Sequence, residues 1–136
     1  MMGIVEAFLR YKMQHEENLY LSAYDELYIL DLSKVIYMQA DDHYTDVYYS
    51  SGTHFLVPFG LIKVENCIAE RPEVSNYLLR MGRKYIVNTR RIFRINTVKE
   101  LLYLTDDSGN SIPLHISKPV LRNFIDRVRQ TVPDIE

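Results

Sequence analysis

Short segments with a period of two, separated by turn residues, are the feature that most limits what this chain can fold into. From Leu19 onward, apolar and aromatic side chains alternate with polar ones over stretches of a few residues. Alternation of this kind predicts half-buried β-strands. The eleven tyrosines point the same way, because aromatic and β-branched residues favour pleated, half-buried surfaces.

The strands are expected in a definite order along the chain. We expect two strands around a turn at 24–26, one over 34–40, a polar link at 41–44, and a hairpin over 45–59 with its turn at 50–52. Two further strands with a break between them are expected over 77–95, and a second hairpin over 99–117 with its turn at 106–110.

Helical periodicity appears in three places. Residues 3–14 place Ile4, Phe8 and Tyr11 on one side, with Met13 close to it, and residues 60–72 carry apolar residues at helical spacing. Residues 117–132 begin with a plausible N-cap, Ser117, followed by a proline in the first turn. The expected fold is therefore mostly β, with helices at the N-terminus, in the middle and at the C-terminus.

The composition argues against several classes of protein. The single cysteine, Cys67, excludes an intramolecular disulfide and a multi-cysteine metal site, and the four histidines lack the spacing of zinc ligands. No apolar run is long enough to cross a membrane, and the N-terminus lacks the features of a secretory signal. We therefore expect a cytoplasmic chain of 136 residues with no catalytic residues, metal or cofactor. The DDHY link could form a metal or acid–base site, but a solvated loop is more common.

The basic residues are concentrated in one part of a chain whose formal net charge is −2. From Val74 to Lys99 there are seven lysines and arginines and no acid, whereas residues 6–46 hold nine acids and three bases. This asymmetry indicates one positive face rather than a uniformly basic surface. Such a face could bind phosphates, although a solvated strand edge would look the same, since charges keep edges from aggregating.

Several of these basic residues follow turn-prone positions. The Arg83–Lys84 pair follows Gly82, and the Arg90–Arg91 pair follows Asn88 and a threonine. Turns raise side chains above a sheet, where arginine can pair with guanine in a major groove. Asn88 could also contact DNA, but an asparagine in a turn more often bonds to the backbone.

Four stretches carry a more specific signal: DLSKVIYMQADDHYTDVYYSSG, FGLIKVENCI, YLLRMGRKYIVNTRRIFRI and HISKPVLRNFI. Their succession resembles the LytTR DNA-binding domain of bacterial transcription regulators. The YIVN core with its upstream basic residues is the most specific part of the match, which covers about residues 18–130.

The resemblance implies an elongated arrangement of small β-sheets with a short central helix, a C-terminal helix and, here, an added N-terminal helix. Loops, rather than a recognition helix, would enter successive major grooves from one face. By position, the loop contacts to duplex DNA would be His43, Tyr44, Arg83, Lys84 and Lys118. By charge and proximity, the phosphate contacts would be Arg80, Arg90 and Arg91, since phosphate contacts position a protein and base contacts specify.

The sequence departs from the family pattern at three places. Gly82 stands where many members carry histidine, Met38 and Gln39 replace a hydrophobic residue followed by glutamate, and Lys118 replaces an arginine. Lysine makes a less directional contact than the planar fork of arginine. These departures bear on the expected base preference more than on DNA binding itself.

The chain is expected to divide into an N-terminal amphipathic helix (residues 1–17), a DNA-binding domain (18–131) and a tail (132–136). The helix could pack on its own sheet or pair two copies on repeated half-sites, and the sequence favours neither. About 17 residues precede the β region, too few for a receiver domain. We therefore expect no phosphorylation control within this chain, unless it is a piece of a longer protein.

Two other functions stay open at the level of sequence. A protein-interaction module that kept the LytTR fold but lost DNA binding would fit the acidic N-terminal third and the net charge of −2. A small-molecule-binding β domain has only the tyrosine content in its favour.

Overall fold

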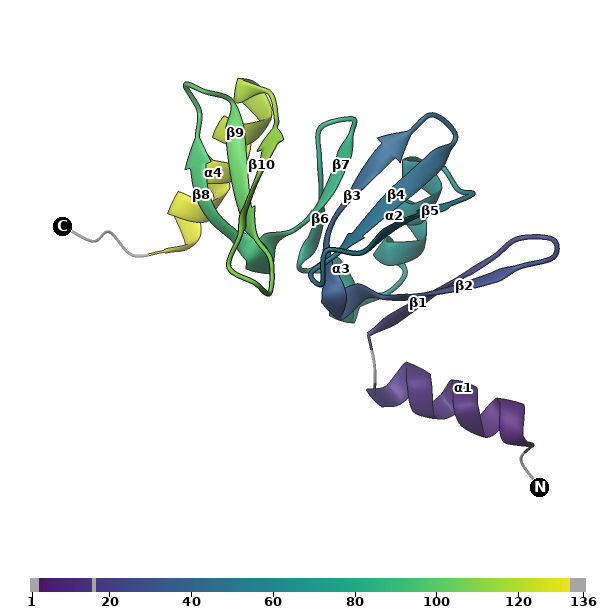
Figure 1. Cartoon of the computed structure of the whole chain (residues 1–136). Helices are drawn as coiled ribbons and strands as arrows, with labels where there is room; N and C mark the ends of the chain where they lie inside the picture. The colour runs from purple at the N-terminus through teal and green to yellow at the C-terminus, as the bar shows by residue number, and fades with distance from the viewer. Residues whose placement is uncertain (1–2, 16, 133–136) are drawn as a thin grey trace.

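The computed structural model describes residues 3–15 and 17–132. In Figure 1 the molecule is elongated, and a five-stranded sheet stands between the β1–β2 hairpin and a three-stranded sheet. The elements are α1 (Ile4–His15), β1 (Asn18–Ser22), β2 (Leu27–Asp31), η1 (Leu32–Lys34), β3 (Val35–Asp41), β4 (Tyr44–Tyr49), β5 (His54–Val57), α2 (Leu61–Ala69), α3 (Pro72–Ser75), β6 (Leu78–Met81), β7 (Tyr85–Asn88), η2 (Thr89–Arg91), β8 (Ile92–Asn96), β9 (Leu101–Thr105), β10 (Ser111–His115) and α4 (Lys118–Thr131). The predicted mostly-β architecture with a central and a C-terminal helix is confirmed.

The five-stranded sheet is antiparallel throughout, in the order β5-β4-β3-β7-β6. Neighbouring strands run in opposite directions, so the β3–β4 and β6–β7 turns lie at one end of the sheet and the β4–β5 turn lies at the other (Figure 1). The turn at 50–52 is confirmed, and Gly52 there adopts a φ of +93°, which favours glycine.

The tyrosines pack on one another across the strands of this sheet. The rings of Tyr37 and Tyr48 are stacked with centroids 4.3 Å apart, and Tyr48 stacks in turn on His54 at 4.7 Å. Tyr85 meets Tyr37 edge-on at 5.9 Å. Cross-strand aromatic pairs of this kind stabilise a sheet, which accounts for part of the tyrosine content without any ligand.

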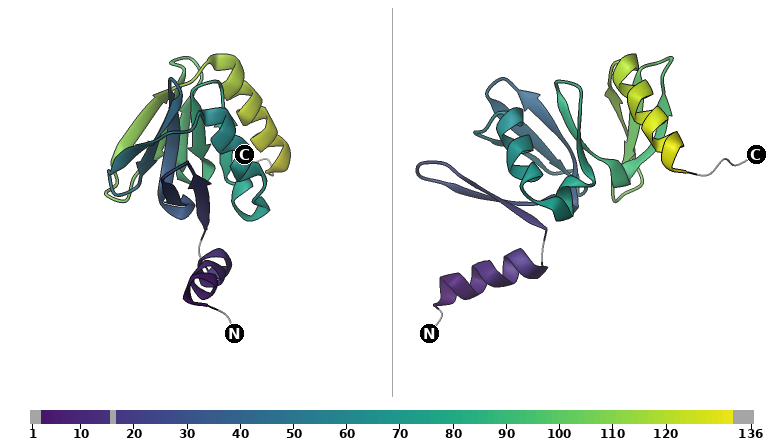
Figure 2. Two further views of the ribbon diagram at one scale, coloured as in Figure 1. Left: turned by 90° about the vertical axis from the view of Figure 1, so that its right-hand side faces the viewer. Right: turned by 180° about the vertical axis from the view of Figure 1, so that it is seen from behind.

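Two hydrophobic cores lie on the two sides of the central sheet. In the first, α2, α3 and the β1–β2 hairpin cover the sheet, with Val64, Ile68 and Val74 buried against Leu30 and Met38. Fully burying an aliphatic side chain of this size contributes about 1.5–3 kcal/mol. The reverse view in Figure 2 shows α2 in front of this sheet and α4 in front of the three-stranded one.

The second core joins the central sheet to the three-stranded sheet, whose order is β10-β9-β8. Val87 of β7 is buried together with Leu102 and Leu104 of β9, Leu114 of β10 and Leu121 of α4. Because strands of both sheets contribute to one core, the two sheets are held together by apolar burial.

A polar link reinforces this junction at the end opposite to the β3–β4 turn. The backbone N–H of Asp107 donates to the carbonyl of Ser50 at 3.2 Å, and the Ser50 hydroxyl donates to the Asp107 carboxylate at 2.8 Å. Arg91 donates to the other carboxylate oxygen at 2.9 Å. The hydrogen bond from Ser50, followed by that from Arg91, holds the pKa of Asp107 below its usual value.

The segment 77–95 contains three strands, where the sequence pattern predicted two. β6 and β7 form a hairpin in the central sheet, and β8 leaves that sheet to pair with β9. Asn88 makes this change of direction: its side chain donates to the carbonyl of Val35 at 2.8 Å and accepts the N–H of Arg90 at 2.9 Å. The predicted role of Asn88 as a turn residue bonded to the backbone is confirmed.

The ends of two helices add detail to the predicted pattern. Pro72 lies just beyond α2, which ends at Ala69, and opens a separate short helix, α3. Ser117 precedes α4 as predicted, but its side chain makes no capping hydrogen bond. The carboxylate of Glu100 takes that place by accepting the N–H of Lys118 at 2.6 Å.

The apolar side of α1 stays accessible in the single chain. Ile4 is 89% exposed, Phe8 45% and Tyr11 57%. The side chain of Met13, predicted to lie close to this face, and residues 133–136 of the expected tail lie outside the described part of the chain.

Candidate nucleic-acid interface

Two of the predicted DNA-contacting pairs lie on neighbouring turns at one end of the central sheet. Tyr44 follows the β3–β4 turn at 42–43, and the β6–β7 turn spans residues 82–84. The N–H of Ala40 donates to the carbonyl of Lys84 at 2.8 Å, which ties the second turn to β3. In the strand order β4-β3-β7-β6 the two hairpins are offset by two strand spacings, or about 10 Å.

The third predicted region, the start of α4, reaches the same end of the molecule. A small cavity of about 160 Å³ is lined by residues 81–85 on one side and by residues 115–117 on the other. Lys118 follows directly after that second stretch. Figure 1 shows the two hairpin turns and the start of α4 along its upper edge, and we call the set formed by turns 42–43, 82–84 and 97–100 with residues 116–118 the turn edge.

The predicted side chains on this edge are turned toward solvent. His43, Arg83, Lys84 and Lys118 are all exposed, and Tyr44 is 48% exposed. His43 lies 3.7 Å from the carboxylate of its neighbour Asp42. Within the described residues, no carboxylate pairs with the side chains of Arg83, Lys84 or Lys118.

Arg80 is adjacent to this edge, but its guanidinium is already engaged. It donates to the carbonyls of Gly82 and Arg83, both at 2.9 Å, and to the carboxylate of Glu65 on α2 at 2.8 Å. The side chain is 21% exposed. The geometry therefore makes Arg80 a brace of the β6–β7 turn. Its contact with a DNA phosphate stays a prediction.

Arg90 and Arg91 lie at the opposite end of β7 and have partners of their own. The Arg90 guanidinium stacks over the ring of Tyr77 at 3.7 Å and lies 4.0 Å from the carboxylate of Glu17. Burial, followed by the hydrogen bond from its hydroxyl to Glu17, raises the pKa of Tyr77. Arg91 pairs with Asp107 at the junction of the two sheets. The structure does not bring this pair to the turn edge.

Comparison with known proteins decides the family. Residues 25–128 match the family model of the LytTr DNA-binding domain. The chain belongs to the LytTR family. The LytTR family is a family of DNA-binding domains used in transcription regulation, and it is not an enzyme family.

A solved structure agrees with this assignment at the level of the fold. The LytTR chain is similar to the LytTr DNA-binding domain of a methyl-accepting/DNA response regulator from Bacillus cereus, with a TM-score of 0.56 and 23% sequence identity. The superposition covers 83% of this chain and 97% of that domain. Among curated proteins no match was found.

The glycine that departs from the LytTR pattern has a structural reason here. Gly82 opens the β6–β7 turn with a φ of +73°, in the left-handed region that favours glycine, and an added Cβ would meet open space. The backbone conformation therefore selects glycine at this position.

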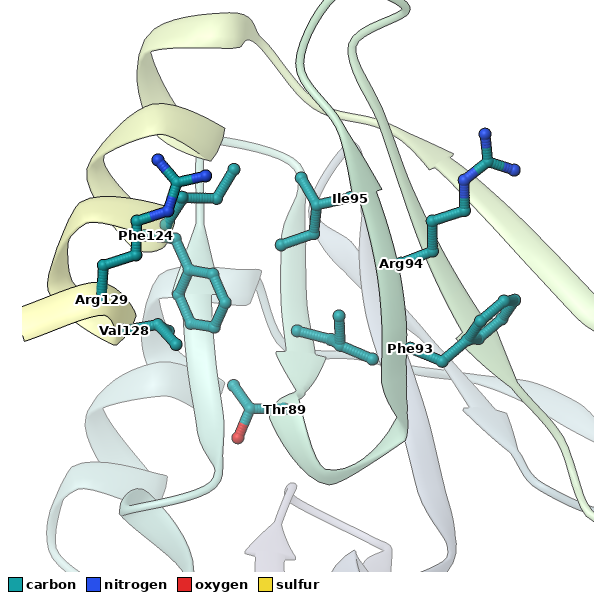
Figure 3. A pocket seen from close by; sticks show the side chains of 9 residues that line it. Thr89, Phe93, Arg94, Ile95, Phe124, Val128 and Arg129 are labelled. Carbon is teal, nitrogen blue, oxygen red and sulfur yellow. The ribbon is translucent and has the colours of Figure 1, made fainter. Parts of the chain in front are cut away.

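A groove of about 470 Å³ lies away from the turn edge, between β8 and α4. Figure 3 shows Ile95, Phe124 and Val128 around it, with Arg129 beside them on α4. None of the residues predicted to touch DNA lines this groove. It is one of the grooves where the small-molecule function left open by the sequence could be located.

Residues 3–15 and 17–132 contain no group of three or more histidine, cysteine, aspartate or glutamate side chains placed to hold a metal ion. Over the same residues, no helix combines the length and the apolar character needed to cross a membrane.

Sequence reasoning missed the acidic residues that shape this edge. Glu65 holds Arg80, and Glu100 caps α4 next to Lys118. Each lies at least fifteen positions from its partner, so no local pattern could have identified either contact.

Proposed function

We propose that this LytTR domain is a sequence-specific transcription regulator in the cytoplasm that contacts duplex DNA with its turn edge. The observation that carries the proposal is that three separate stretches meet there with unpaired cationic or aromatic side chains, although each was identified from sequence alone. Lysine and arginine without protein partners are suited to neutralise DNA phosphates.

Within this proposal the loops enter successive major grooves. The two hairpin turns, about 10 Å apart, match a major groove about 12 Å wide. Lys118 lies at the start of α4, on the side of the three-stranded sheet, so it is suited to reach the neighbouring turn of the duplex. Arg83 is assigned to base edges, since arginine can bond bidentately to guanine, and Lys84 and Lys118 to base edges or adjacent phosphates. His43 and Tyr44 contact DNA from the first turn.

Selection of binding sites from a random duplex pool, followed by substitution of Arg83, tests these roles. Arg83→Ala should cost about 1–3 kcal/mol of discrimination at one base position of the selected site. Lys84→Ala serves as the comparison: weaker binding to all duplexes alike would assign Lys84 to a phosphate, and a loss of discrimination at one position would assign it to a base. If Arg83→Ala also weakens all sequences equally, Arg83 does not read a base.

The proposal divides the chain as the sequence suggested, into a helix at 1–17, a DNA-binding domain at 18–131 and a short tail at 132–136. It also includes pairing of two copies through α1 on repeated half-sites. The accessible apolar side of α1, with Ile4 and Val5 exposed by 89% and 66%, supports this pairing. Sedimentation with and without residues 1–15 tests it, and an unchanged monomer mass rejects it.

A further inference from the structure

The β8–β9 turn, residues 97–100, closes at the turn edge and has a fixed shape. Asn96 pairs with Leu101 across the turn, and its side chain accepts the N–H of Lys99 at 3.0 Å. The carbonyl of Thr97 accepts the N–H of Glu100 at 3.3 Å, and Glu100 has a φ of +55°. A turn with these internal bonds presents its exposed side chains in a limited set of positions.

Glu100 joins this turn to the start of α4. Its carbonyl accepts the N–H of Ile116 at 3.1 Å, and its carboxylate accepts the N–H of Lys118 at 2.6 Å. A carboxylate at this position also suits the positive end of the helix dipole. The turn and the first residue of α4 therefore behave as one unit, and the position of Lys99 is linked to that of Lys118.

The Lys99 side chain is exposed and points to no carboxylate. Across the described part of the chain no ion pair involves its ammonium group, whereas Lys34, at the end of β3 opposite to the turn edge, lies 3.8 Å from Asp31. Figure 1 shows the β8–β9 turn beside the start of α4 on the same upper edge as the hairpin turns. The edge assigned to DNA thus carries a further turn with a cationic side chain.

We propose that Lys99 contacts a DNA phosphate and that Glu100 is a positioning residue for both Lys99 and Lys118. The inference rests on the proposed function, because it needs the turn edge to face a duplex. It extends the proposed contact surface from three stretches to four. The added stretch lies on the side of the three-stranded sheet, so the surface follows the DNA backbone further in that direction.

A salt titration of the full chain tests the role of Lys99. Binding to a fluorescent duplex of random sequence is measured by polarisation for the wild type, Lys99→Ala and the control Lys34→Ala. Loss of one phosphate contact lowers the slope of log affinity against log salt by about 0.9, so the advantage of the wild type shrinks about 3.5-fold between about 50 and about 200 mM salt. Lys34→Ala should keep the wild-type slope, and Lys99→Arg should restore it.

The positioning role of Glu100 is tested with two uncharged replacements. Glu100→Gln can still accept the N–H of Lys118, whereas Glu100→Gly cannot, although glycine suits the positive φ at this position. Both remove the same charge, so a lower DNA affinity for the glycine variant isolates the hydrogen bond. Equal affinities for the two variants overturn the positioning role.

The outcomes separate this inference from the function on which it rests. If the wild type binds with a salt-dependent affinity and Lys99→Ala matches Lys34→Ala in slope, Lys99 does not contact DNA, but the proposed function stands. If the wild type shows no salt-dependent binding, both fail, and the protein-interaction alternative is favoured.

Discussion

The brace formed by Arg80 leads to a prediction that contrasts with a direct role in DNA binding. Its guanidinium holds two carbonyls of the β6–β7 turn and the carboxylate of Glu65. Lysine keeps the positive charge but lacks the planar fork that makes three such bonds at once. Arg80→Lys therefore separates the charge of this residue from its geometry.

The expected size of the effect follows from those contacts. Each hydrogen bond to a turn carbonyl contributes about 1 kcal/mol net, and the partly exposed ion pair adds about 0.2–1 kcal/mol. We therefore expect Arg80→Ala to lower the free energy of unfolding by about 2–3 kcal/mol. In the lysine variant the β6–β7 turn is held less firmly, so the side chains of Arg83 and Lys84 must be ordered when DNA binds. This ordering should cost about 1–2 kcal/mol, which weakens DNA affinity about 5- to 30-fold.

Fluorescence polarisation over a range of salt concentrations gives the deciding measurement. The brace predicts that Arg80→Lys loses affinity while the slope of log affinity against log salt stays at the wild-type value, because no charge is lost. Arg94→Lys, on β8 and stacked on Tyr103 at 4.9 Å, is the matched control and should bind like the wild type. Wild-type affinity for Arg80→Lys, together with a slope lowered by about 0.9 in Arg80→Ala, would refute the brace and restore a phosphate contact.

Substitutions at three further positions give independent predictions. Arg90→Ala should lower the free energy of unfolding by about 0.5–1 kcal/mol through loss of the stack on Tyr77. A salt slope lowered by about one unit in this variant would instead support a phosphate contact by Arg90. Asp107→Asn should be less stable than the wild type near neutral pH. Because the pKa of Asp107 is depressed in the folded chain, the difference in unfolding free energy, measured with denaturant, should vanish as the pH falls below about 4. A difference that stays constant with pH would contradict the pairing with Arg91. Gly82→Ala should lower the unfolding free energy by about 1–2 kcal/mol because of the φ of +73° at this position, and Gly82→Asn should lower it less. Equal stability of the wild type and the alanine variant would contradict the left-handed turn.

The sequence predicted most strands and turns because these depend on local patterns. Alternation of apolar and polar residues predicted the strands on either side of 24–26, 50–52 and 106–110. The structure has turns at these three places, as predicted. The helix at α2 followed from apolar residues at helical spacing. Family resemblance added the order of the loops, which alternation alone does not contain.

What the sequence could not supply depends on contacts between distant positions. β8 was missed because its pairing with β9, rather than any local signal, draws residues 92–96 away from the central sheet. The acidic partners of Arg80 and Arg91 could not be predicted, because they lie 15 and 16 positions away along the chain. An acid-free segment can still be neutralised by acids from elsewhere in the chain, so the seven basic residues do not form one surface.

Amide chemical-shift mapping of the isotope-labelled full chain tests the central claim most directly. On addition of a duplex, the account predicts that the largest shifts fall at residues 41–44, 82–85, 97–100 and 115–118, and that they weaken as salt is raised. Shifts concentrated at η2, around Arg90 and Arg91, or in the groove between β8 and α4 would contradict the assignment of the turn edge as the DNA-binding surface.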